Sequence, residues 1–185
     1  ENPRTHFFRG LGYMWLKDYA ESERCMIQAV QKGGGDENIF FYLAVVQEKQ
    51  NKQDEAVLSL KSALKAEPGS ARAMNYLGYI YADRGVNLDQ AESLIGKALE
   101  IEPDNGAYID SMGWVFYRKG DYSRALDLLL KAEKRLDETD MADPVVFEHI
   151  GDTCLKLGDR DRAVQYWKKS LKMEDREEVR QKVRT

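Results

Sequence analysis

Apolar residues recur along the chain at helical spacing, in pairs of segments that are separated by a glycine or an asparagine. In the middle of the chain, one such stripe consists of Met74, Leu77, Gly78 and Tyr81, and the next consists of Leu94, Ile95, Ala98 and Leu99. Spacings of three and four residues place each stripe on one face of an α-helix. Gly85 lies between the two stripes and tolerates the left-handed backbone that ends a helix. The pattern therefore predicts two helices joined by a tight turn.

The same hairpin pattern is repeated along most of the chain. Small residues recur in two columns, one formed by Ala44, Gly78, Gly113 and Gly151 and the other by Ala63, Ala98, Ala132 and Ser170. The repeat length is about 34 residues. The opening segment joins the series through Gly12 and Ala29, with a turn that is shorter by about two residues. We therefore expect a repeat domain over 1–173, with five hairpins at 4–34, 36–69, 70–104, 105–138 and 144–173, and a charged capping helix or tail over 174–185.

The columns of the third hairpin resemble the tetratricopeptide repeat (TPR) family. The family pattern is met by Met74, Leu77-Gly78, Tyr81, Ala91, Ile95, Ala98 and Pro103, and most of it recurs in the other hairpins. The resemblance implies an all-α, right-handed superhelical solenoid in which each repeat contacts only its neighbours. It also implies that the first helices of the repeats line a concave groove that binds a peptide or protein segment.

Groove positions on a first helix are offset by one residue from its core stripe. Counting on that basis assigns an aromatic stripe to the groove, which consists of Tyr13, Phe41, Tyr42, Tyr76, Tyr79, Trp114 and Tyr117. Three polar residues share the groove: Arg72 and Asp110 are suited to pair with a ligand's charges, and Asn75 is suited to hold a peptide backbone through its amide. Tyrosine and tryptophan are residue types that often anchor protein interfaces. The alternative is that the rings only fill space between adjacent first helices.

Two narrower resemblances bear on the partner. The stretch 75–126 is similar to the C-terminal repeats of bacterial TPR lipoproteins, including adaptors of carboxy-terminal processing proteases, and implies a periplasmic or outer-membrane-tethered protein. The sequence starts at Glu1 and is expected to be a trimmed piece without the lipid-accepting cysteine, so a cytoplasmic location stays open. TPR domains that capture a chaperone's C-terminal carboxylate use Lys, Asn and Arg in columns that here hold Arg9, Tyr13, Tyr42, Arg72 and Tyr76. Chaperone-tail binding is therefore not expected.

Composition and charge argue against several other classes of function. The net charge is −4 and the basic residues are interspersed with Asp and Glu, so nucleic acid is not an expected partner. The apolar runs are shorter than the roughly 18 residues that a membrane helix needs, so this stretch is not expected to insert into a membrane. His6 and His149 lie in the first and last repeats, as do Cys25 and Cys154. We therefore expect no metal site, catalytic triad, disulfide or cofactor.

The sequence thus favours a non-enzymatic module that binds a peptide or protein segment in an aromatic groove, as a bacterial envelope adaptor or assembly factor. The alternative is a structural scaffold that assembles through the solenoid ends or the convex faces. A homodimer through exposed repeat ends is a further expectation.

Overall fold

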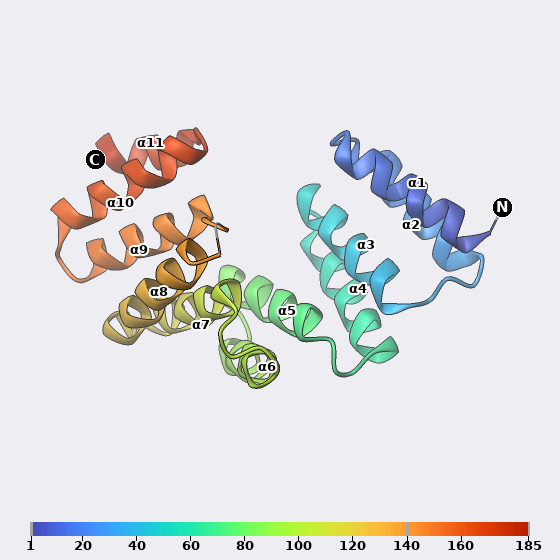
Figure 1. Ribbon diagram of the computed structural model, residues 1–185, viewed down its shortest axis with the longest axis horizontal. Coiled ribbons are helices and arrows are strands. Elements are labelled where there is room, and N and C mark those ends of the chain that lie inside the picture. The colour runs from blue at the N-terminus through green and yellow to red at the C-terminus, as the bar shows by residue number, and fades with distance from the viewer. Residues whose placement is uncertain (1, 140, 185) are drawn as a thin grey trace. The chain divides into compact units, whose positions relative to one another are not determined.

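The computed structural model describes residues 2–139 and 141–184, and within these ranges the chain consists of helices and connecting loops (Figure 1). Ten of the helices follow one another in five helix–turn–helix pairs: α1 (Pro3–Trp15) and α2 (Tyr19–Gln31), α3 (Glu37–Lys49) and α4 (Gln53–Ala66), α5 (Ala71–Arg84) and α6 (Leu88–Ile101), α7 (Gly106–Lys119) and α8 (Tyr122–Asp137), and α9 (Pro144–Lys156) and α10 (Arg160–Met173). A shorter helix, α11 (Glu177–Arg184), follows. The all-α class, the helical hairpins and the helix in the charged C-terminal end are confirmed.

Short polar residues and left-handed turns set the ends of these helices. Asp36 precedes α3, and its Oδ1 accepts a hydrogen bond from the Ile39 backbone N–H at 3.0 Å. This bond satisfies an amide that has no partner within the helix. Between the two helices of a hairpin, Gly120 has a φ of 86° and Asn51 a φ of 60°. The sequence predicts both turns correctly, because glycine and asparagine tolerate this backbone conformation.

The chain divides into two compact units, unit 1 (Glu1–Ile80) and unit 2 (Tyr81–Thr185). The core of unit 1 includes Met26, Leu43 and Val46, which α2 and α3 supply. The core of unit 2 is a larger cluster that α7, α8, α9 and α10 share, and Val179 of α11 belongs to it. Each unit also buries one free thiol, Cys25 in unit 1 and Cys154 in unit 2.

The columns of small residues lie where the two helices of a hairpin approach closely. A Cβ atom added to Gly113 would lie 2.8 Å from Leu129 Cγ on α8. One added to Gly151 would lie 2.5 Å from the Trp167 indole on α10. Both distances are shorter than a carbon–carbon contact allows. Glycine at these two positions therefore permits the packing of the hairpin.

The register that the sequence predicts for the first hairpin is wrong. A Cβ atom on Gly12 would meet nothing within 4 Å, whereas one on Gly10 would lie 3.1 Å from Met26 Cγ on α2. The Ser22 hydroxyl donates a hydrogen bond to the Gly10 carbonyl at 2.7 Å, which fixes the same crossing. Gly10, and not Gly12, is therefore the small residue of this repeat. With that register the first turn has the same length as the turns of the second, fourth and fifth hairpins, and Tyr13 takes the column of the buried Phe116.

Candidate functional site

The first helices of unit 1 bring five aromatic rings into one continuous row. This aromatic ladder consists of Phe8 and Phe7 on α1, Tyr42 and Phe41 on α3, and Tyr76 on α5. Its four successive contacts have ring centroids 5.7, 5.8, 5.6 and 5.9 Å apart, in that order. Phe8 is 65% exposed, and the other four rings are half-buried. The ladder therefore consists of one exposed ring and four partly exposed rings.

Arg72 packs against the ladder and is already paired within the chain. Its guanidinium carbon lies 4.4 Å from the centre of the Phe41 ring and 5.8 Å from that of Tyr42. Arg72 Nε donates to Glu37 Oε1 at 3.0 Å, and Nη2 binds Glu37 Oε2. The Ser70 hydroxyl also donates to Glu37, at 2.7 Å. Burial acts to raise the pKa of Glu37, but the bonds from Arg72 and Ser70 outweigh it and hold the pKa below its usual value.

The other predicted residues of unit 1 lie beside the ladder. The Tyr76 hydroxyl donates to Glu48 Oε2 at 3.3 Å, and burial followed by the Glu48 charge raises the pKa of Tyr76. Asn75 is half-buried, and its Oδ1 has no hydrogen-bond partner among the described residues. Tyr13 and Tyr79 are also half-buried. Their assignment to a binding surface stays a prediction.

In unit 2 the predicted residues form a closed stack with His149. The Trp114 ring centre lies 4.0 Å from that of His149, with 13° between the planes, and 4.4 Å from that of Tyr117, with 6° between the planes. Asp110 and Trp114 are only 6% and 7% exposed, and Tyr117 is half-buried. Both faces of the Trp114 indole are therefore covered by residues of the chain itself. In this arrangement Asp110 and Trp114 are packed side chains, as the space-filling alternative describes.

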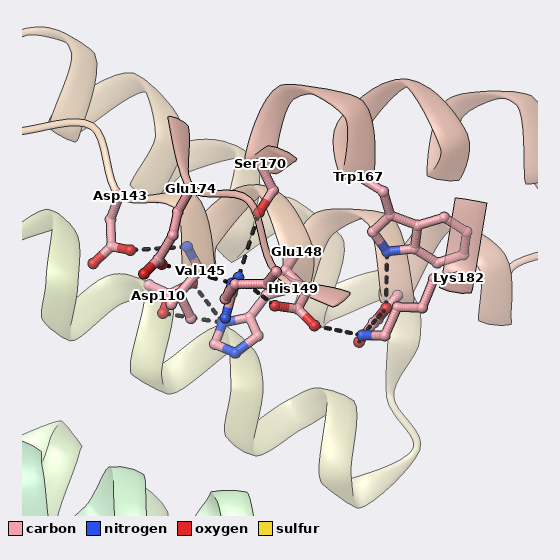
Figure 2. A network of polar contacts seen from close by, with 11 residues as sticks. Asp110, Asp143, Val145, Glu148, His149, Trp167, Ser170, Glu174 and Lys182 are labelled. Atoms are coloured by element: carbon pink, nitrogen blue, oxygen red, sulfur yellow. Dashed lines mark hydrogen bonds and ion pairs between the residues drawn. The ribbon is translucent and has the colours of Figure 1, made fainter. Parts of the chain in front are cut away.

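A buried ion pair joins α7 to α9 within this stack. His149 Nδ1 lies 3.0 Å from Asp110 Oδ1 and 3.1 Å from Oδ2 (Figure 2). Burial acts to lower the pKa of His149, but the Asp110 carboxylate, with Asp152 and Glu148, outweighs burial and raises the pKa above its usual value. The charged imidazolium is thus favoured and donates its Nδ1–H to Asp110.

A second set of ion pairs joins α9 to the C-terminal helix α11. Lys182 Nζ lies 2.6 Å from Glu148 Oε1 and 2.7 Å from Asp152 Oδ2 (Figure 2). Arg176, just before α11, reaches Glu148 Oε2 at 2.5 Å. The Trp167 indole N–H donates to Asp152 Oδ1 at 2.9 Å. Glu148 and Asp152, one turn apart on α9, therefore hold two cations and an indole.

Sequence reasoning missed four residues of these two sites. Phe7 and Phe8 were hidden by the wrong register of the first hairpin: counted from Gly10, Phe7 falls in the column of Phe41. Glu37 and His149 were missed because their partners lie 35 and 39 residues away, one repeat along the chain. Charged residues in adjacent columns of neighbouring repeats are the signal that identifies such pairs.

The described part of the chain has neither a metal-type cluster nor a membrane-type helix. Across 2–139 and 141–184, no group of three or more His, Cys, Asp and Glu residues is arranged to hold a metal ion. Among the helices in these ranges, none combines the length and the apolar character that crossing a bilayer requires.

Comparisons with known proteins point to one family. The tetratricopeptide repeat pattern matches residues 43–108, and a second pattern with the same description matches residues 146–176, so that the two cover just over half of the chain. A TPR repeat-containing protein of Pseudomonas aeruginosa is 34% identical over 129 residues, which are 68% of this chain and 21% of that protein. The chain spans about a fifth, or less, of the length of the curated relatives it matches.

Two solved structures share the fold. A thermophilic TPR protein of Thermus thermophilus aligns with a TM-score of 0.78 at 19% identity, over 98% of this chain and 96% of the other. A chain of the APC/C heterotetramer Cut9–Hcn1 aligns with a TM-score of 0.86 at 15% identity, over 98% of this chain and 35% of the other.

Proposed function

The chain belongs to the tetratricopeptide repeat family, whose fold commonly mediates protein–protein interaction, and on that premise we propose that unit 1 is a non-enzymatic module that binds an extended peptide segment along its aromatic ladder. The observation that carries this proposal is the row of five rings from α1 to α5, at centroid distances of 5.6 to 5.9 Å. The row crosses three successive repeats, which matches the reach of an extended chain better than that of a small molecule.

The chemistry of the ladder indicates the kind of segment. Aromatic rings that neighbouring side chains hold in place lose little entropy when they bind, and they present a large apolar area. The positive charge of Arg72 is neutralised by Glu37, so this site offers no free cation there for a C-terminal carboxylate. The ligand of this surface is therefore a segment with apolar or aromatic side chains. The Asn75 amide has the donor and acceptor groups to form hydrogen bonds with the backbone of such a segment.

The ladder is tested with ring-removing variants. Peptides that bind the purified chain are selected from an unbiased display library, and their affinities are measured by fluorescence polarisation. Phe8→Ala and Tyr42→Ala should each weaken binding by about 2 kcal/mol, or roughly 30-fold, as is typical of an interface anchor. Leu58→Ala is the matched control, because Leu58 is 64% exposed on the second helix α4. Equal affinities for all three variants with an intact helical fold would contradict the proposal.

We also propose that the full-length protein acts in the bacterial envelope as an adaptor or assembly factor. The support is the similarity of 75–126 to repeats of bacterial TPR lipoproteins, together with the bacterial relative that is 34% identical. The test is fractionation of cells that express the full-length protein at its natural level. Recovery in the membrane or periplasmic fraction is expected, and recovery in the cytoplasm alone would refute this role.

A scaffold that assembles through a repeat end is the second candidate. Its support is α1, which exposes Phe8 (65%) and Trp15 (83%), together with the residue that follows the helix, Leu16 (77%). Apolar side chains gathered on one exposed helix are typical of an interaction surface. A homodimer through this end is expected to dissociate in the Trp15→Glu variant, as measured by light scattering after size exclusion. A monomeric parent chain would remove this candidate and leave peptide binding on the ladder unaffected.

A further inference from the structure

The C-terminal helix α11 rests on unit 2 through a small set of contacts. Its Val179 is fully buried and belongs to the core cluster that includes Trp167 and Ile150, and Val183 packs on the same cluster. Ionic contacts to carboxylates of α9 come from Lys182 of α11 and from Arg176, which directly precedes the helix. Val179, Val183 and these two cations are thus among the side chains that hold the helix in place.

A helix that covers this surface must bring a cation to it. Glu148 and Asp152 expose only 15% and 16% of their side chains, and they lie one helical turn apart. Lys182 reaches both at 2.6 and 2.7 Å, while Arg176 reaches Glu148. Carboxylates in so little water are unfavourable without a positive partner. A helix that covered these carboxylates in place of α11 would keep water from them in the same way, and would therefore have to supply its own cation.

Helix α11 itself is poorly suited to permanent docking. It has eight residues, from Glu177 to Arg184, and an isolated helix of that length is marginal in water. The side chains of Arg176, just before the helix, and of Lys182 within it remain 26% and 32% exposed, so water and salt weaken their ion pairs. A longer helix with the same side chains would bury more surface and would start from a more stable helical state.

We propose that the surface formed by α9 and α10 beneath α11 is a docking site for a basic amphipathic helix of a partner protein, and that α11 is the internal occupant which such a helix displaces. The partner helix carries a cation at its N-cap, as Arg176 does for α11 by accepting the Arg180 backbone N–H at its carbonyl. Two apolar residues and a second cation follow with the spacing of Val179, Lys182 and Val183, that is i+3, i+6 and i+7 from the cap. This site belongs to unit 2 and shares no residue with the aromatic ladder of unit 1, so the proposal does not depend on peptide binding there.

The spacing follows from the geometry of the occupied site. Residues at i+3, i+6 and i+7 share one helical face with the residue at i. One face of the partner therefore places an apolar residue over the Trp167 region and a lysine between the two carboxylates. A helix with acidic residues at the cation positions would meet Glu148 and Asp152 with like charges and would be rejected.

The test uses α11 as its own probe. A fluorescent peptide of residues 174–185 is titrated into the chain of residues 1–185 and into the same chain with Val179→Asp. In this variant α11 carries a carboxylate where the core requires valine. In the parent chain the tethered α11 competes at high effective concentration, so the peptide should bind the variant at least about tenfold more tightly. A peptide with Lys182→Glu is the matched control and should not bind.

Two measurements keep the outcome decisive. Hydrogen exchange should show that the peptide protects amides of α9 and α10 in the variant, and circular dichroism should show that the variant keeps its other helices. Equal, weak binding to the parent and to the folded variant would overturn the proposal. A dimer of the parent chain in which two copies exchange α11, detected by light scattering, would overturn it as well, because the occupant would then be a second copy.

Discussion

The pair of Asp110 and His149 shows how one buried charge ties two repeats together. The imidazole is 4% exposed, shares its Nδ1 between both carboxylate oxygens, and is covered on one face by Trp114. Removing one member of a buried pair leaves the other without compensation, which costs about 3–5 kcal/mol. Three acidic groups act on His149, namely Asp110 from α7 and Glu148 and Asp152 on α9, while Lys182 and Arg176 bind the carboxylates of the latter two. The surroundings therefore stabilise the charged form.

The raised pKa of His149 gives its stabilising effect a definite dependence on pH. Because the pKa is higher in the folded chain than the usual value of about 6.5, the contribution is fully present below that value and is lost as pH rises through the folded-state pKa. The His149→Gln variant should thus differ most from the parent at pH 6, by about 3 kcal/mol, and less at pH 9. Urea unfolding of both proteins at pH 6 and at pH 9 measures the difference in their free energies of unfolding. For Asp110→Asn, the difference from the parent in the free energy of unfolding should likewise be smaller at pH 9 than at pH 6. A difference that grows with pH would contradict the stabilising role of the charged His149.

At the scale of the helical element, the contact between the two helices of a hairpin depends on one small residue in the first helix, which is glycine in most repeats and Ala44 in the second. Gly151 faces the fully buried Trp167 on α10, whereas Gly12 on α1 faces open space. The two positions are therefore a matched pair: both are helical glycines, and only one lies at a helix crossing. Alanine should have opposite effects at the two positions. At Gly151 its methyl group would clash with the neighbouring helix, whereas at Gly12 it would only favour the helical conformation.

The expected outcome is a change of opposite sign in thermal stability. Gly151→Ala should lower the free energy of unfolding by about 2 kcal/mol, since the new methyl group would force the indole and the helix apart. Gly12→Ala should raise it by up to about 1 kcal/mol, because alanine restricts the unfolded chain and prefers the helix. Thermal unfolding followed by circular dichroism compares the two. If Gly12→Ala proved as destabilising as Gly151→Ala, the register built on Gly10 would be wrong.

The helices and most of the turns could be predicted from the sequence. A small residue that recurs at the same position in four repeats reflects the packing of the hairpin and not the helix propensity of one segment. The first hairpin failed because Gly10 and Gly12 both offer a small residue, and only the packing against Met26 and Ser22 distinguishes them. The aromatic columns were predicted, but which rings stay open was not. That depends on pairs such as Arg72 with Glu37, whose members belong to different repeats and whose geometry no single repeat encodes.

At the scale of the whole molecule, a repeat protein transmits a local change mainly to adjacent repeats, since each repeat packs on its neighbours alone. Stability is then a property of each region and not of the chain as one body. Unit 1 carries the aromatic ladder, and unit 2 carries the buried ion pair and the docked α11. A variant in one unit is expected to leave the binding property of the other largely intact.

The two buried thiols allow the independence of the two units to be measured with a thiol-modifying reagent. Cys25 and Cys154 are 0% and 1% exposed, one in each unit, so a disulfide reagent can modify either sulfur only after local opening. Gly151→Ala should speed the modification of Cys154 at least about tenfold, as a loss of 1.4 kcal/mol or more implies, and should change the rate at Cys25 little. Chains with Cys25→Ala or Cys154→Ala assign the two rates, and equal acceleration at both sulfurs would show that the units open together. The two sulfurs thus report the local opening of unit 1 and of unit 2 separately, with no dye or tag added.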